Sequence, residues 1–229
     1  MTWIVLIAIL LFNFFATRKL SSGRPRGAQN VLEWVFDFVK NLISDGMDYQ
    51  KGRPLLTYMV TLISFIFFSN MLGLIPNFTF GLLKNVEFLQ LNEIFHGATL
   101  QSPTADVNTT GALAVLTLIL FVGYGIIVQK GHYFKHFLEP NPAFLLIHLI
   151  ELVAKPVTLA MRLFGNIFAG EVLIKVILMM PAVGLLLGGI WPDAVWLGFS
   201  IFVGAIQSFV FTVLTIAYVA QSVASNEEH

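Results

Sequence analysis

The chain has 229 residues, of which 57% are hydrophobic and 11% are charged, and its formal net charge at pH 7 is zero. A soluble domain of this length has about a quarter of its residues charged, so the composition excludes an ordinary soluble protein. The balanced charge gives no basic surface for nucleic acid, and the lack of cysteine excludes disulfides, thiolate metal sites and cysteine nucleophiles.

Apolar segments near or above the roughly 18 residues that cross a bilayer recur along the sequence. They predict one membrane domain over residues 1–229, an all-α polytopic membrane protein with five transmembrane helices and one interfacial amphipathic helix. The first span covers residues 2–17. It has no basic region before it and no small-residue cleavage site, so we interpret it as a short span rather than a cleavable signal. Whether a further segment precedes residue 1 is left open.

The next element, residues 30–50, is predicted to be an amphipathic helix that lies in the membrane interface. Val39 and Leu42 belong to an apolar side that recurs at helical spacing, whereas Asp37 and Lys40 occupy the other side. A helix that docks on a soluble face is the alternative.

The remaining elements are two spans, a polar loop between them and a long pair of C-terminal helices. In chain order they are a span over 54–76, an external loop over 77–108, a span over 109–129, a helix over 143–180 that is broken or bent near Pro156, and a last helix over 193–222.

Lysine and arginine counts predict the orientation of these elements. Residues 18–53 carry seven such residues, and the 77–108 loop carries one. Because cytoplasmic loops are enriched in lysine and arginine, we place 18–53 and 130–142 in the cytoplasm and 77–108 outside. The N-terminus is then outside and the C-terminus is cytoplasmic.

The 143–180 helix carries a stripe of polar side chains along one edge. At about 100° per residue, the members lie within about 40° of one line and cover about 27 Å of helix. They are His148, Glu151, Lys155, Thr158, Arg162 and Asn166. An ionisable group inside a membrane costs at least about 2.5 kcal/mol and faces protein or water, so the stripe predicts a functional site. A Glu151–Lys155 ion pair and snorkelling of Arg162 to a headgroup are the alternatives, and the apolar turns beside Arg162 make snorkelling poor.

A second set of polar residues lies off this stripe. Glu171 is about 180° from Arg162 and about 13 Å further along the axis, so it faces another helix of the same protein. Lys175 is four residues on, which leaves a neutralising ion pair open. In the last helix Ser200 and Gln207 share a face, and the glutamine is the more costly of the two in lipid.

Several segments of the sequence carry a family resemblance. The two longest are KPVTLAMRLFGNIFAGE (155–171) and SIFVGAIQSFVFTVLTIAYVAQ (200–221). Together with QNVLEWVFDFV, NMLGL and SPTAD, they resemble subunit a of bacterial F-type ATP synthases, particularly those of Gram-positive bacteria. The likeness covers nearly the whole chain.

The resemblance implies a non-catalytic, proton-translocating subunit in the bacterial cell membrane. Its implied partners are the c-subunit ring, the b-subunit of the peripheral stalk, the rest of the ATP synthase complex and the lipid bilayer. Protons would enter from outside by one half-channel, neutralise a carboxylate of the ring, and leave by a second half-channel to the cytoplasm. The long, tilted C-terminal helix pair would carry this path, and no cofactor or metal is implied.

The matching arginine is Arg162, which the resemblance places between the half-channels and facing the ring. A guanidinium stays protonated in proteins, so it can attract a ring carboxylate and block a direct leak. A lysine could lose its proton there. Asn166 and Gln207 match polar partners of this arginine, and Gln207 is expected to orient the guanidinium by a hydrogen bond.

The other members of the implied path lie on either side of Arg162. Glu171 matches the outer half-channel carboxylate, although Lys175 beside it is a departure from the family. Ser200 stands where some members have a histidine or an acid. The exit side is expected to contain His148, Glu151 and Thr158, with Glu151 as the exit carboxylate.

Three other functions remain as alternatives. A sodium-coupled version of the same subunit would look alike, because the ion-binding carboxylate belongs to the c-subunit. A stand-alone secondary transporter would usually show inverted repeats, and this sequence has none. An intramembrane metalloprotease or serine hydrolase would need H-E-x-x-H or G-x-S-x-G, and both patterns are absent from the sequence.

Overall fold

The computed structural model describes residues 2–18, 27–83, 102–129, 143–179 and 190–224. Within these ranges the regular structure is entirely helical, which confirms the all-α class. In chain order the elements are α1 (Thr2–Thr17), α2 (Ala28–Gly46), α3 (Tyr49–Gly52), the 3-10 helix η1 (Arg53–Leu55), α4 (Leu56–Leu83), the 3-10 helix η3 (Pro103–Ala105), α6 (Val107–Gln129), α8 (Ala143–Met179) and α9 (Ile190–Ala224).

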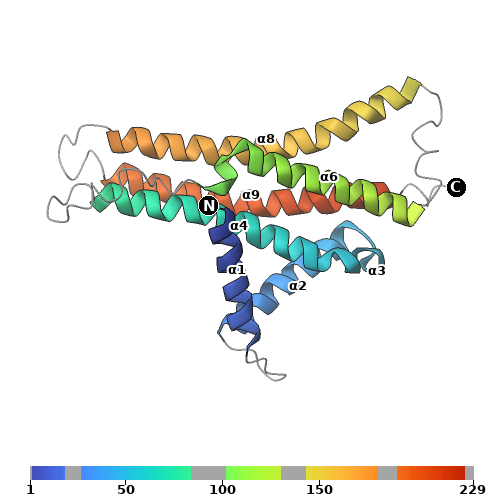
Figure 1. Ribbon diagram of the computed structural model, residues 1–229, viewed down its shortest axis with the longest axis horizontal. Coiled ribbons are helices and arrows are strands. Elements are labelled where there is room, and N and C mark those ends of the chain that lie inside the picture. The colour runs from blue at the N-terminus through green and yellow to red at the C-terminus, as the bar shows by residue number, and fades with distance from the viewer. Residues whose placement is uncertain (1, 19–26, 84–101, 130–142, 180–189, 225–229) are drawn as a thin grey trace.

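Four helices run alongside one another and form an elongated bundle. Figure 1 shows α4, α6, α8 and α9 along its long axis, with α8 and α9 antiparallel, while α1 and α2 project from one side. The helices α8 and α9 are 37 and 35 residues long, whereas α6 covers only one half of the bundle. The short helix η3 precedes α6 and packs against α4, α6 and α8.

Three described helical stretches are long and apolar enough to cross a membrane. They are Tyr49–Leu72, Val107–Gln129 and Val195–Val223, and the apolar α1 is shorter. The chain is therefore a multi-pass helical membrane protein, as the composition predicts. The count of five spans stays a prediction, because α1 is short and α8 carries charged residues.

Prolines lie at two of the differences between predicted and observed helix bounds. The helix α4 continues past Pro76 to Leu83, so the loop predicted over 77–108 is wrong for its first residues. Proline removes one backbone donor, and a helix in lipid keeps its other bonds because no water replaces them. Pro192 lies in the first turn of α9, where a missing N–H is tolerated, so that helix begins before residue 193. The helix α8 contains Pro156 and curves without breaking (Figure 1).

The helix α2 is amphipathic and packs against α4 and α9. Val39 and Ile43 are buried, while Asp37 and Lys40 are exposed. It ends at Gly46, earlier than predicted, and Asp48 then caps α3 by accepting a hydrogen bond from the Gln50 backbone N–H at 3.1 Å. This division of charged and apolar sides is typical of an interfacial helix.

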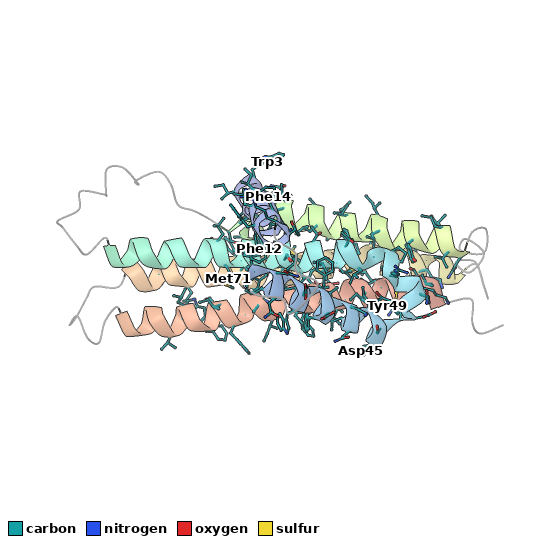
Figure 2. All side chains as sticks on the ribbon, turned by 90° about the horizontal axis from the view of Figure 1, so that it is seen from below. Trp3, Phe12, Phe14, Asp45, Tyr49 and Met71 are labelled. Carbon is teal, nitrogen blue, oxygen red and sulfur yellow. The ribbon has the colours of Figure 1, made fainter. Side chains whose placement is uncertain are left out.

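The helix α1 is apolar on all sides, as expected for a helix between protein and lipid. Its Phe12 lies beside α4, with its ring centroid 6.2 Å from that of Phe68. Trp3 is 77% exposed and points away from the bundle (Figure 2).

The helices α4 and α9 approach each other closely at Gly204. A Cβ atom at this glycine would lie 3.1 Å from Asn70 Cβ and 3.3 Å from Met71 Cε. Asn70 Nδ2 donates a hydrogen bond to the Gly204 carbonyl at 2.9 Å. Small residues let helix backbones approach closely in membranes, where van der Waals packing and hydrogen bonds drive association.

This crossing predicts a disulfide between Asn70→Cys and Gly204→Cys. Disulfide Cβ atoms are about 3.5–4.5 Å apart, so the two helices need to separate by only a few tenths of an ångström. The chain has no cysteine of its own. Mild oxidation should therefore give one intrachain disulfide, which mass spectrometry with thiol blocking would detect.

The matched control pairs Asn70→Cys with Gly198→Cys on the same helix. A Cβ atom at Gly198 has no neighbour within 4 Å. Equal disulfide yields from the two pairs would contradict the observed crossing.

Candidate functional site

The polar edge of α8 presents Arg162 outward. Its side chain is exposed, and none of the described residues forms a hydrogen bond or ion pair with it. The hydrogen bond expected from Gln207 to Arg162 is absent from the described structure. The Gln207 side chain instead uses Oε1 to accept a hydrogen bond from Asn166 Nδ2 at 3.0 Å, which joins α8 to α9 four residues beyond the arginine.

Lys155 forms the ion pair that the sequence left open. Its Nζ lies 2.8 Å from Glu151 Oε1 and donates a second hydrogen bond to Gln221 Oε1 on α9 at 3.0 Å. The ammonium also lies over the Tyr218 ring, 5.4 Å from its centroid. The charge of Lys155 is therefore shared between its own helix and α9.

Thr158 and His148 are the remaining residues of the stripe. Thr158 is exposed, and its hydroxyl donates to the backbone carbonyls of Ala154 and Lys155 at 2.8 and 3.0 Å. The described hydrogen bonds of this hydroxyl therefore stay within α8. His148 is half-buried near the start of α8.

Glu171 lies on the other side of α8, as the helical count predicts. It is 2% exposed, and its Oε1 accepts a hydrogen bond from the Ser102 backbone N–H at 2.7 Å. The side chain of Lys175 is outside the described part of the chain, so its pairing with Glu171 stays a prediction.

A buried hydrogen-bonded network leads from Glu171 to the α4–α9 crossing. Ser102 Oγ donates to the Ser69 carbonyl at 2.7 Å, and its oxygen lies 2.6 Å from Thr104 Oγ1. Thr104 Oγ1 donates to Asn70 Oδ1 at 2.6 Å, and Asn70 binds the Gly204 carbonyl. The hydroxyl and amide groups of this network are at most 2% exposed.

Sequence reasoning missed this network. Ser102 and Thr104 belong to the SPTAD segment, and Asn70 belongs to NMLGL. Both segments carry the family resemblance, but neither indicates a hydrogen-bonded network by its spacing. An asparagine inside an apolar span was the available signal, because a polar group there requires a partner.

A cavity of about 410 Å³ lies between α8 and α9 and is lined in part by Asn166, Ser200 and Gln207. Ser200 is 6% exposed and Gln207 is 3% exposed. Neither Ser200 Oγ nor Gln207 Nε2 has a hydrogen-bond partner in the described structure. Since buried polar groups are almost always hydrogen-bonded, these two groups favour water in the cavity.

The polar groups gathered along α8 and α9 are amides, hydroxyls, carboxylates and two cations. Among the described residues, no three His, Asp or Glu side chains gather so that they could hold a metal ion. The arrangement is suited to binding, orienting and exchanging protons.

The sequence matches a known family over most of its length. Residues 1–220 match the family described as ATP synthase A chain. The chain belongs to the ATP synthase A chain family.

Individual relatives agree with the family. The chain is 39% identical to ATP synthase subunit a of Desulforamulus reducens, over all of this chain and 80% of the relative. It is 39% identical to subunit a of Priestia megaterium, over 99% of this chain and 91% of the relative. The Bacillus subtilis subunit a is 40% identical over 95% of this chain and 88% of its own length.

Family membership confirms three of the predictions. The chain is a member of the ATP synthase a subunits, it belongs to the membrane sector of that complex, and it is not itself catalytic. The multi-pass helical structure agrees with this place in the complex.

The hydrogen-bonded network that includes Thr104 predicts that Thr104→Val destabilises the protein more than Thr104→Ser. Thr104→Val leaves the buried Asn70 Oδ1 without its donor, and we expect a loss of about 1 kcal/mol in the free energy of unfolding. Thr104→Ser keeps the hydroxyl and should lose less. Denaturant unfolding of the purified protein in detergent would measure the difference.

Thr61→Val is the matched control. The Thr61 side chain is exposed, and its hydroxyl donates to the Thr57 carbonyl of its own helix at 2.8 Å. If Thr104→Val were as stable as Thr61→Val, the network would not stabilise the fold.

Proposed function

We propose that this chain is the stator subunit a of an F-type ATP synthase and provides two offset proton half-channels beside the c-subunit ring. Proton translocation through them is coupled to rotation for ATP synthesis or hydrolysis. The observation that carries the proposal is the opposite placement of two charged residues on α8. Arg162 is exposed on one face, and Glu171 is buried on the other.

Arg162 acts as the barrier between the half-channels. A guanidinium remains protonated even where water is scarce, so it stabilises the ionised form of a ring carboxyl group. It thereby favours loss of the proton from that carboxyl group. A fixed cation between two hydrated clefts also repels protons that would otherwise pass directly. The exposure of Arg162 on α8 supports contact with a neighbouring subunit.

The entry half-channel runs along the Glu171 side and the cavity between α8 and α9. Glu171 accepts the incoming proton, and water beside Ser200 and Gln207 passes it toward the ring. Support comes from the cavity of about 410 Å³ and from the unpartnered Ser200 Oγ and Gln207 Nε2 on its wall. Asn166 holds Gln207 in place through the 3.0 Å hydrogen bond.

The exit half-channel runs along the stripe toward the start of α8. Glu151 is the exit carboxylate, and His148 and Thr158 lie along the same edge. The Glu151 side chain is 51% exposed and pairs with Lys155, so an ionised Glu151 is stabilised where protons leave.

The rest of the proposal concerns partners and orientation. The c-subunit ring faces the exposed edge of α8, and the b-subunit of the peripheral stalk and the remaining synthase subunits complete the complex. The bacterial cell membrane is the location, with the N-terminus outside and the C-terminus in the cytoplasm. The seven Lys and Arg residues of 18–53 support this orientation.

We favour protons over sodium ions as the transported species. Sodium sites in membrane proteins are built from oxygen ligands, often the carbonyls of unwound helices. Here α8 and α9 are continuous, and Gln207 Oε1 already accepts a hydrogen bond. The two unpartnered groups on the cavity wall are the Ser200 hydroxyl and a Gln207 N–H donor, and both suit water.

Arg162→Ala should abolish ATP-driven proton pumping by the assembled complex. Removal of one positioned electrostatic group typically costs about a hundredfold in rate. Passive proton leak through membranes stripped of the catalytic sector should be retained or raised. Pumping and leak would be measured in vesicles with a fluorescent pH probe, and ATP hydrolysis would be measured in parallel.

Arg53→Ala is the matched control, because Arg53 is exposed in η1 and lies off the proposed path. It should pump like wild type. Normal coupled pumping by Arg162→Ala would refute the barrier role.

The wild-type complex should acidify vesicles in sodium-free buffer, because the unpartnered groups on the cavity wall suit water, which can carry protons. A protonophore should abolish the signal at once. Sodium-dependent pumping that survives the protonophore would instead identify the sodium-coupled version of the subunit.

A further inference from the structure

Lys155 pairs with Glu151 in the proposed exit path, and it also links α8 to α9. Its side chain is only 21% exposed, and Nζ contacts Glu151 on α8 and Gln221 on α9 at 2.8 and 3.0 Å. The Tyr218 ring lies under the same ammonium, and it also packs against Phe121 of α6 with ring centroids 6.0 Å apart. A lysine in this environment is tolerated because its charge is paired and hydrogen-bonded.

A second polar link joins the same two helices further along. Asn166 Nδ2 donates to Gln207 Oε1 at 3.0 Å. The helices α8 and α9 are antiparallel (Figure 1). The Lys155–Gln221 and Asn166–Gln207 hydrogen bonds therefore join them at two successive levels. The two levels are separated by about 16 Å along α8, at 1.5 Å per residue.

Arg162 lies between these two levels. It is two turns beyond Lys155 and about one turn before Asn166, and all three lie near one line on the helix. Packing of α8 against α6, α9 and η3 limits its rotation, and the two polar links add directional restraints on the side that faces α9. Two links on either side fix the rotation of the intervening turns, and with it the direction in which the arginine points.

We propose that Lys155, through its link to Gln221, is a positioning residue that holds Arg162 toward the partner ring, an inference that rests on the proposed function. Rotation of α8 by one residue, about 100°, would turn Arg162 away from the exposed face. Glu151 neutralises the ammonium beside it. In contrast to Lys155, Arg162 has no acidic partner among the described residues, so its charge is available to a ring carboxylate.

The test compares both partners of the link in the assembled complex. Lys155→Met and Gln221→Leu should each lower the number of protons pumped per ATP hydrolysed by about fivefold or more, the lower end of coupling between sites. Lys155→Arg keeps a charged donor and should retain most of the pumping. The exchange Lys155→Gln with Gln221→Lys restores a lysine–glutamine pair and should recover pumping relative to either single variant.

If Lys155 only stabilised the fold, passive leak would stay at the wild-type level in complexes that assemble normally. Passive leak through stripped membranes should be raised in Lys155→Met and Gln221→Leu, because an Arg162 that points away from the ring no longer closes the path between the half-channels. Lys40→Met is the matched control, since Lys40 also lies over a tyrosine ring, that of Tyr49 at 5.5 Å, but on α2. It should pump normally. Subunit content of each purified complex would establish that assembly is intact.

Two outcomes overturn the inference. One is wild-type coupling in Lys155→Met or Gln221→Leu, and the other is failure of the exchange variant to recover any pumping. Arg162→Ala, run alongside, separates this inference from the proposed function. Loss of pumping in Arg162→Ala with normal pumping in both link variants refutes only the positioning role, whereas normal pumping in Arg162→Ala refutes the proposed function.

Discussion

The cost of an ionic group in the hydrocarbon layer is the constraint on which this structure depends. The helix α8 is too charged to sit in lipid alone, so its charges must find partners on other elements. Lys155 binds Glu151 and Gln221 of α9, and Glu171 accepts a hydrogen bond from the backbone N–H of Ser102, which precedes η3. Arg162 is left exposed with no described partner, and that exception is what makes it a candidate for contact with another subunit.

The same constraint explains why the helices pack as they do. In a bilayer the apolar surfaces of helices gain little by leaving lipid, so close packing and polar links hold the bundle together. Gly204 lets α4 approach α9 closely enough for Asn70 to reach a backbone carbonyl. Thr104 of η3 donates a hydrogen bond to Asn70, and Ser102, directly before η3, donates its backbone N–H to Glu171. The carboxylate is therefore held by elements that are distant in sequence.

Much of the fold and part of the site could be predicted from the sequence, because helical periodicity and membrane cost are local properties. The opposite placement of Arg162 and Glu171 follows from counting residues along one helix. The partner of Gln207 could not be predicted, since Asn166 and Arg162 were both within one turn and only packing chooses between them. The continuation of α4 past Pro76 was missed because proline ends helices more often in water than in lipid.

The continuity of α8 has a mechanical consequence for the proposed function. Lys155 precedes Pro156, whereas Arg162 and Glu171 follow it, and all three belong to one uninterrupted helix. Rotation that moved the arginine away from a ring would move the carboxylate out of its site on η3 at the same time. The contact between Glu171 and Ser102 therefore opposes such rotation from one end, as Lys155 does from the other. The proposed function requires a stator helix that stays fixed while a ring moves past it, and these two contacts on α8 meet that requirement.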